Sequence, residues 1–187
     1  MNNQDFNEAI ESVETPYGKI SFFREDLYLG RSLREYGEWA KKELDFLSAL
    51  VRPGSVIIDA GAFIGTHTLA FSKFTGPEGK VYSFEAHPTF FKLLEKNIKD
   101  NSITNVSTFN SGLSNKTGKM KVEDVDIHST NSFGSMKLKE DKPGNNMLDI
   151  GITTIDSLNI ESCDLIKLDV EGMEASVLSG ASKLLKN

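Results

Sequence analysis

The segment V-I-I-D-A-G-A-F-I-G, from Val56 to Gly65, is the strongest indication of fold in this 187-residue chain. Three consecutive branched apolar residues predict a strand that is buried on both faces, and the acidic and small residues after them end it abruptly. Gly61 and Gly65 allow the backbone to turn sharply and to approach a bound molecule closely. Gly65 also opens an apolar helix whose N–H groups face that molecule. The stretch therefore predicts a strand that ends in a ligand-binding loop, with Asp59 facing the same crevice.

A dinucleotide site is the first alternative for this loop. Its fingerprint needs glycines at offsets of zero, two and five, and counting from Gly61 those offsets fall on Phe63 and Thr66, so the match fails. A second acid, Glu85, ends the next apolar segment, V-Y-S-F-E-A. The two acids together resemble the S-adenosylmethionine site of Rossmann-like methyltransferases, with Asp59 near the methionine ammonium and Glu85 accepting hydrogen bonds from the ribose hydroxyls. A structural strand and turn without a ligand is the alternative that stays open.

The composition is that of a soluble globular domain, with 39% hydrophobic and 26% charged residues. A net charge of −6, without a run of Lys or Arg longer than Lys41-Lys42, argues against a nucleic-acid partner and favours a neutral or cationic small molecule. Cys163 is the only cysteine, so no intrachain disulfide is expected. The first residues lack both a basic end and an apolar run, and no later run approaches the length of a membrane span, so neither a signal peptide nor a membrane span is expected. We therefore expect one domain in the cytoplasm with no membrane partner.

Two regions are expected along the chain. Residues 1–50 would form an N-terminal hairpin and helix that cap the site, and residues 51–187 would form the Rossmann-like ligand-binding domain. Short apolar runs in residues 13–29 predict the hairpin. Apolar residues at helical spacing from Ser32 to Val51 predict one helix before the first strand.

Aromatic and acidic residues gather at the start of that helix. Tyr36, Glu38 and Trp39 would cap the cofactor or admit the substrate. The alternative is that the two aromatic side chains pack into the core.

Strands and helices alternate through the middle of the chain. Residues 81–86 predict a second strand, residues 88–100 a helix and residues 106–113 a third strand. This spacing indicates right-handed crossovers and a parallel sheet covered on both faces.

The alternation then becomes irregular. Residues 119–127 alternate with period two, as an exposed antiparallel strand would, and residues 150–155 predict another strand. Between them, residues 128–146 are polar and predict a functional lid. Residues 164–170 predict the fourth parallel strand, and apolar residues from Met173 to Leu184 predict a last helix.

The segment K-L-D-V-E-G-M-E, from Lys167 to Glu174, ends the fourth strand. Residues two apart on a strand share a face, so Lys167 and Asp169 point the same way and Glu171 lies in the following turn. Asp169 is then either a site residue or a structural partner of the lysine. In a sheet ordered 3-2-1-4 the first and fourth strands flank the switch point, so Asp169 would lie close to Asp59.

Five motifs in this order resemble the FkbM-type family of S-adenosylmethionine-dependent methyltransferases. They are D-A-G-A-F-I-G-T-H-T-L (59–69), F-E-A-H-P (84–88), N-S-F-G-S-M (131–136), T-I-D-S-L (154–158) and D-L-I-K-L-D-V-E-G-M-E (164–174), with weaker support from Y-G-E-W (36–39). The resemblance implies an α/β, Rossmann-like class I methyltransferase fold with a mostly parallel sheet in the order 3-2-1-4. It also implies O-methylation of a hydroxyl on a sugar, a polyketide or a similar small metabolite, with S-adenosylmethionine as the cofactor.

The resemblance also suggests site residues. Those for the cofactor are Asp59, Gly61, Ala62, Phe63, Gly65, Thr66, His67, Glu85, Ala86, Ser111, Gly112 and Asp169. The candidate bases or substrate anchors are, in order of preference, Asp169, Glu171 and His128, and the last of these is otherwise a solvated loop residue. Residues expected near the substrate are Tyr36, Glu38, Asn131 and Ser135. The acids at 169 and 171 could hold a divalent cation, but no further ligand set accompanies them, so no metal is expected.

Further expectations concern the last part of the fold. The family's sheet normally continues beyond the last helix, so this chain would lack the C-terminal strands. It would then be a fragment of an enzyme or a subunit that binds the cofactor without catalysis, and the retained acids Asp169 and Glu171 favour the enzyme. The fourth strand would lie at an exposed edge, where a second copy could pair to form a homodimer.

Overall fold

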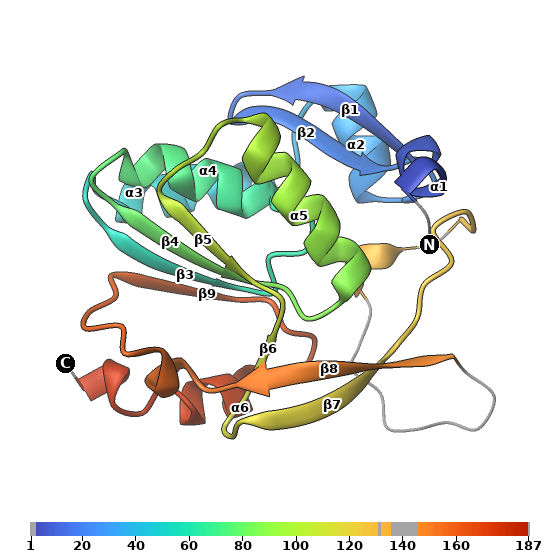
Figure 1. Cartoon of the computed structure of the whole chain (residues 1–187). Helices are drawn as coiled ribbons and strands as arrows, with labels where there is room; N and C mark the ends of the chain where they lie inside the picture. The colour runs from blue at the N-terminus through green and yellow to red at the C-terminus, as the bar shows by residue number, and fades with distance from the viewer. Residues whose placement is uncertain (1–2, 131, 136–145, 187) are drawn as a thin grey trace.

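Four parallel strands form the main sheet, in the order β5-β4-β3-β9 (Figure 1). The computed structural model of the chain describes residues 3–130, 132–135 and 146–186. The strands of the sheet are β3 (Val56–Ala60), β4 (Lys80–Phe84), β5 (Val106–Phe109) and β9 (Leu165–Leu168). Numbered along the chain this order is 3-2-1-4, so the predicted order and the predicted parallel pairing are confirmed.

Helices and two smaller sheets complete the described structure. The helices are α1 (Asn3–Glu8), α2 (Leu29–Tyr36), α3 (Lys41–Leu50), α4 (Thr66–Thr75), α5 (Pro88–Asp100) and α6 (Glu174–Ser179), with short 3-10 helices η1 (Phe133–Ser135), η2 (Ile155–Leu158) and η3 (Leu184–Lys186). The remaining strands are β1 (Ile10–Thr15), β2 (Gly18–Phe23), β6 (Gly112–Leu113), β7 (Gly118–Glu123) and β8 (Met147–Thr153). None of the described helices combines the length and the hydrophobicity needed to cross a membrane.

Helices cover both faces of the main sheet, because neighbouring residues of a buried strand point to opposite sides. Ile57 packs with Phe71 of α4 and with Val81 on one face. Ile58 packs with Val177 of α6 on the other. Figure 1 shows α3, α4 and α5 on one side of the sheet and α6 on the opposite side. The apolar run that starts β3 therefore contributes to two separate cores, as an α/β fold requires.

The single helix predicted from Ser32 to Val51 is wrong, because the structure has two helices in this region. α2 ends where Gly37 adopts a φ of 65° and donates its N–H to the carbonyl of Leu33. Ala40, which has a φ of 53°, then precedes α3. Left-handed residues of this kind terminate a helix. The apolar periodicity did not reveal the break because the pattern continues across it.

The predicted hairpin is confirmed, since β1 and β2 pair antiparallel, and Asn97 of α5 fixes it to the rest of the molecule. The fully buried Asn97 side chain accepts the N–H of Ser21 at 2.8 Å and donates to the carbonyls of Ser21 at 2.9 Å and Ile64 at 2.8 Å. Phe23 of the hairpin lies in the same hydrophobic core as Ile64 and Phe90. One amide therefore joins the hairpin, α5 and the loop after β3.

The third strand predicted over residues 106–113 is divided in the structure. β5 ends at Phe109, and β6 belongs to a different sheet with the order β6-β8-β7. Gly112 lies so close to its neighbour in β8 that a Cβ would meet the Cγ2 atom of Ile152 at 3.2 Å. The predicted antiparallel strand after residue 118 is confirmed as β7, which pairs with β8. Within the predicted lid, residues 131 and 136–145 lie outside the described residues.

α6 is shorter than the predicted last helix. It ends just before Gly180, where a Cβ would lie 2.0 Å from the carbonyl oxygen of Ser114. Asp156 holds the turn that follows, because its carboxylate accepts the backbone N–H groups of Lys183 and Leu184. The acid of the T-I-D-S-L motif is therefore structural in this fold.

β9 lies at the edge of the main sheet and, within the described part of the chain, pairs only with β3. One of its faces is covered, because Ile166 and Leu168 pack with Val177 and Leu184. The pairing of two copies along this edge stays a prediction.

Replacing Asn97 by alanine should lower the free energy of unfolding by about 3 kcal/mol, because the backbone groups of Ser21 and Ile64 would lose buried partners worth about 1–3 kcal/mol each. Urea unfolding followed by circular dichroism measures this loss. Asn115→Ala, at an exposed position, is the control and should change stability by less than about 0.5 kcal/mol. A loss below about 1 kcal/mol for the Asn97 variant would contradict the role given to this amide.

Candidate functional site

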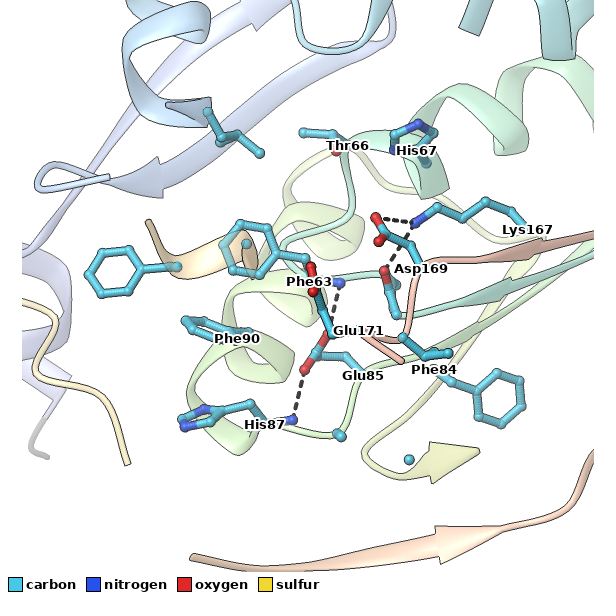
Figure 2. A pocket seen from close by; sticks show the side chains of 18 of the residues that line it. Phe63, Thr66, His67, Phe84, Glu85, His87, Phe90, Lys167, Asp169 and Glu171 are labelled. Atoms are coloured by element: carbon cyan, nitrogen blue, oxygen red, sulfur yellow. Dashed lines mark hydrogen bonds and ion pairs between the residues drawn. The ribbon is translucent and has the colours of Figure 1, made fainter. Parts of the chain in front are cut away.

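A cavity of about 480 Å³ opens at the carboxyl ends of β3, β4 and β9 (Figure 2). Its volume lies in the range of about 300–1,000 Å³ that is usual for small-molecule sites. Most of the cofactor residues predicted from the sequence line it, namely Gly61, Ala62, Phe63, Thr66, His67, Glu85, Ala86, Ser111, Gly112 and Asp169. The fold therefore brings these segments, which are far apart in the chain, to one place.

The loop after β3 is shaped by close packing within the protein. Gly61 has a φ of 80°, and a Cβ at this position would lie 1.9 Å from the carbonyl oxygen of Asp169. Gly65 has a φ of 92°, and a Cβ there would lie 2.7 Å from the Cδ1 atom of Leu94. Gly65 does not line the cavity. Both glycines are therefore required by neighbouring protein atoms, in addition to any ligand that the loop holds.

Glu85 is a buried carboxylate in the cavity wall, directly after β4. Its Oε2 accepts the N–H of Phe63 at 2.8 Å, and its Oε1 accepts the N–H of His87 at 2.7 Å. Burial raises the pKa of Glu85 to about 7, although these two N–H groups act in the opposite direction. Each carboxylate oxygen has a further lone pair, so the group can also accept hydrogen bonds from a ligand.

Asp59 lies behind the cavity wall and does not line the crevice as the sequence suggested. Its side chain is fully buried, and its Oδ2 accepts the hydroxyl of Thr68 at 2.6 Å. Its Oδ1 lies 3.5 Å from the ammonium nitrogen of Lys167, which does line the cavity. The carboxylate therefore faces a lysine and a threonine of its own chain, because the neighbouring strand places Lys167 in front of it.

Asp169 and Glu171 line the cavity together, in the turn after β9. The side chain of Asp169 is 61% exposed and lies 3.4 Å from the Lys167 ammonium. Glu171 has a φ of 49°, which is uncommon for a residue other than glycine. His128, the third predicted base, is elsewhere: its Nε2 lies 2.8 Å from a carboxylate oxygen of Asp5 in an exposed segment.

The two histidines near the strand ends have different roles. His67 lines the cavity from the start of α4, and its Nε2 lies 3.4 Å from a carboxylate oxygen of Glu43. Burial, with the nearby charge of Lys167, lowers the pKa of His67, so its ring is neutral near pH 7. His87 caps α5, because its Nδ1 accepts the N–H of Thr89 at 3.2 Å.

A family model described as the methyltransferase FkbM domain matches residues 59–187. The chain belongs to the FkbM methyltransferase family. The resemblance found in the five motifs is thereby confirmed. Because the match begins at Asp59, the N-terminal region that contributes to the cavity lies outside it.

The curated proteins that resemble this FkbM-family chain include methyltransferases with different substrates. The hexuronic acid methyltransferase AglP of Haloferax volcanii is 29% identical over 137 residues, which are 71% of this chain and 52% of AglP. The tRNA (adenine(58)-N(1))-methyltransferase catalytic subunit TRM61 of Yarrowia lipolytica is 32% identical over 83 residues, which are 44% of this chain and 21% of TRM61. The chain thus matches about half the length of the first and about a fifth of the second.

Among solved structures, the FkbM methyltransferase of Methylobacillus flagellatus is similar to this chain with a TM-score of 0.48. The sequence identity is 18%, and the match covers 77% of this chain and 37% of that chain.

The N-terminal wall of the FkbM-family site differs from the predicted one. Tyr36 and Glu38 do not line the cavity, and the side chain of Tyr36 points into solvent with 72% of its surface exposed. The residues of this region that do line it are Asp26, Tyr28, Leu29 and Trp39. Asp26 is buried there because its Oδ1 accepts the N–H groups of Tyr28 and Gly30 at the start of α2. An acid just before a helix is a capping signal that could have located it.

The predicted substrate residues near η1 are only partly described. Asn131 lies outside the described residues, and so does the side chain of Ser135. Their neighbours Ser132, Phe133 and Gly134 line the cavity. The ring of Phe133 packs against Phe90 at 6.1 Å, and Phe90 packs edge-on against Phe63 at 4.7 Å. The polar segment around η1 therefore contributes an aromatic side chain, Phe133, to the cavity wall that Phe90 and Phe63 also form.

Within the described residues, no group of three or more His, Cys, Asp or Glu side chains is arranged so that it could hold a metal ion. Asp169 and Glu171 were the acids considered for a cation. The absence of a metal stays a prediction.

Raising the pH should destabilise the protein through Glu85, and Glu85→Gln should remove this effect. The pKa of Glu85 rises from 4.5 to about 7 on folding, so the folded state retains a proton that the unfolded chain releases. The resulting stabilisation is complete below about pH 4.5 and is lost as the pH rises through about 7, a loss of about 3 kcal/mol. Urea unfolding at both ends of this window should show the Gln variant gaining about 3 kcal/mol over the wild type at the higher pH. A pH-independent difference would contradict the raised pKa.

Proposed function

We propose that this chain is an S-adenosylmethionine-dependent methyltransferase that methylates a hydroxyl of a small metabolite. Membership of the FkbM family supports the reaction class. The observation that carries the proposal is Glu85, a buried carboxylate that follows β4 in the wall of a cavity. An acceptor at this position suits the two hydroxyls of a ribose, because hydrogen bonds to a charged acceptor are strong.

The cavity fits an adenosyl cofactor in volume and in lining. About 480 Å³ is enough for a molecule of this size. Glu85 would hold the ribose, while Ala86, Gly112 and Leu113 give the wall beside it an apolar surface that suits a flat base. The loop after β3, from Gly61 to Phe63, would hold the rest of the cofactor. Asp59 has no direct part in this arrangement, because Lys167 lies between it and the cavity.

Bound S-adenosylmethionine supplies a methyl group that is activated by a positively charged sulfur. The task of the protein is to align the acceptor hydroxyl and to take its proton. Asp169 is the first candidate for this base, because its exposed carboxylate lines the cavity and the Lys167 ammonium lies 3.4 Å from it. Glu171, in the same turn, is the second candidate.

The proposed acceptor is a small hydroxylated molecule, with no nucleic acid as partner. The name of AglP gives hexuronic acid as its substrate and that of TRM61 gives tRNA, so the relatives point to different acceptors. A net charge of −6 opposes the approach of a phosphate backbone. Asp26, Asp169 and Glu171 in the cavity wall act in the same direction.

Binding of S-adenosylhomocysteine should release a proton from Glu85. With a pKa of about 7 the group is mostly protonated at pH 6, whereas hydrogen bonds from ribose hydroxyls favour the carboxylate. Calorimetry at pH 6 in buffers of different ionisation enthalpy should show a release approaching about one proton, which falls toward zero by about pH 8.5. Glu85→Gln should abolish the release and weaken binding about ten- to hundredfold. Failure of the wild type to bind would contradict the cofactor, and binding without proton release would contradict the role of Glu85.

Asp169→Asn should lower turnover about a hundredfold or more while S-adenosylhomocysteine affinity changes less than about threefold, because a base acts on the acceptor and not on the cofactor. Formation of S-adenosylhomocysteine with a panel of sugars and polyketides identifies an acceptor and then measures turnover. Glu171→Gln is the matched comparison and should lose less activity. Near-normal turnover of Asp169→Asn would leave Asp169 with a structural role only.

A further inference from the structure

Lys167 places a positive charge among three oxygen atoms of the site. Its Nζ lies 3.2 Å from the carbonyl oxygen of Gly61, 3.4 Å from Oδ2 of Asp169 and 3.5 Å from Oδ1 of Asp59. Only 9% of the lysine side chain is exposed. An ammonium has three N–H donors, which equals the number of these oxygens. Figure 2 shows the Lys167 side chain reaching Asp169 at the cavity.

Asp59 depends on this lysine. Oδ2 of Asp59 accepts the Thr68 hydroxyl, whereas Oδ1 is buried and has no hydrogen-bond partner within the described residues. Lys167 forms an ion pair with Asp59. The two residues also lie opposite each other where β3 pairs with β9. A buried carboxylate without a countercharge is strongly destabilising. The pair is therefore set by the register of two buried strands.

The backbone around the lysine is closely packed. A Cβ at Gly61 would lie 1.9 Å from the carbonyl oxygen of Asp169, and the N–H of Asp169 donates to the carbonyl of Ala60 at 3.0 Å. The loop after β3 and the turn after β9 therefore touch directly, and the Lys167 ammonium binds an oxygen of each.

We propose that Lys167 is a positioning residue that joins the two walls of the cavity, the loop after β3 through the Gly61 carbonyl and the turn after β9 through the Asp169 carboxylate. Asp59 is the buried carboxylate that holds the ammonium in place. The inference rests on the proposed function, in which the loop binds the cofactor and Asp169 is the candidate base. In this proposal Asp59 holds Lys167 in place and does not contact the methionine ammonium of the cofactor directly.

The alternative role for Lys167 is that of a countercharge to Asp59 and nothing more. Two measurements on the same variants separate the roles: the melting temperature, which reports charge balance in the core, and S-adenosylhomocysteine affinity by calorimetry, which reports the geometry of the walls. The variants are Lys167→Met, Lys167→Arg, Asp59→Asn and the double variant Asp59→Asn/Lys167→Met. Lys99→Met, at an exposed position of α5, is the matched control.

Lys167→Met should lower the melting temperature by about 5 °C or more, because it leaves Asp59 buried and unpaired. It should also weaken S-adenosylhomocysteine binding about tenfold or more. The double variant should regain most of the melting temperature but remain about tenfold weaker in binding, because the Gly61 carbonyl and the Asp169 carboxylate still lack the donor that they share. Lys167→Arg should bind within about threefold of the wild type, since it keeps a charged donor.

Recovery of both quantities in the double variant would overturn the proposal, because Lys167 would then be a countercharge only. Unchanged stability and affinity in Lys167→Met would overturn it as well. For Asp59→Asn, 5′-methylthioadenosine serves as a probe that lacks the amino-acid end of the cofactor. Loss of S-adenosylhomocysteine affinity with unchanged methylthioadenosine affinity would show that Asp59 contacts that end directly, against the proposal. Failure of the wild type to bind S-adenosylhomocysteine would contradict the proposed function before any variant is compared, and the melting temperatures would still decide whether Lys167 and Asp59 form the buried pair.

Discussion

The register of β3 against β9 is the constraint on which the site depends. Parallel pairing makes Asp59 and Lys167 partners, and the carboxyl ends of both strands meet at one edge of the sheet. A slip of one residue would turn Lys167 to the opposite face and leave Asp59 buried without a countercharge. Ile57 and Ile58, packed in separate cores on the two faces, oppose such a slip. The arrangement of the cavity is therefore a consequence of how the core of the sheet packs.

Two acids that end neighbouring strands have different partners. Asp59 faces a lysine within ion-pair distance. Glu85 accepts two backbone N–H groups, and its burial raises its pKa to about 7. A ligand that donates hydrogen bonds to Glu85 therefore favours release of the Glu85 proton near neutral pH, which leaves the carboxylate negatively charged. The two acids therefore take different tasks, since Asp59 holds Lys167 behind the cavity wall and Glu85 lines the cavity.

The N-terminal region completes the cavity although it lies before the matched family domain. Its hairpin is held on α5 by the buried amide of Asn97, which also binds the carbonyl of Ile64 in the loop after β3. The region that carries Asp26 and Trp39 therefore packs with the loop after β3, which also lines the cavity. We infer that this region belongs to the site and is more than a cap placed over it.

The strands of the main sheet, the loop that follows Val56–Ala60 and the position of Glu85 could be predicted from the amino-acid sequence, and the family resemblance supplied the strand order. The first three follow from local patterns, because runs of branched apolar residues, glycines and acids at strand ends act over a few residues. Three features could not be predicted from local patterns: Asp59 faces Lys167, the helix breaks between Gly37 and Ala40, and Asp26 lines the cavity where Tyr36 does not. Each of these depends on contacts with segments far along the chain or on left-handed backbone conformations. A local pattern shows that a side chain is buried, but its partner there is chosen by packing and strand register.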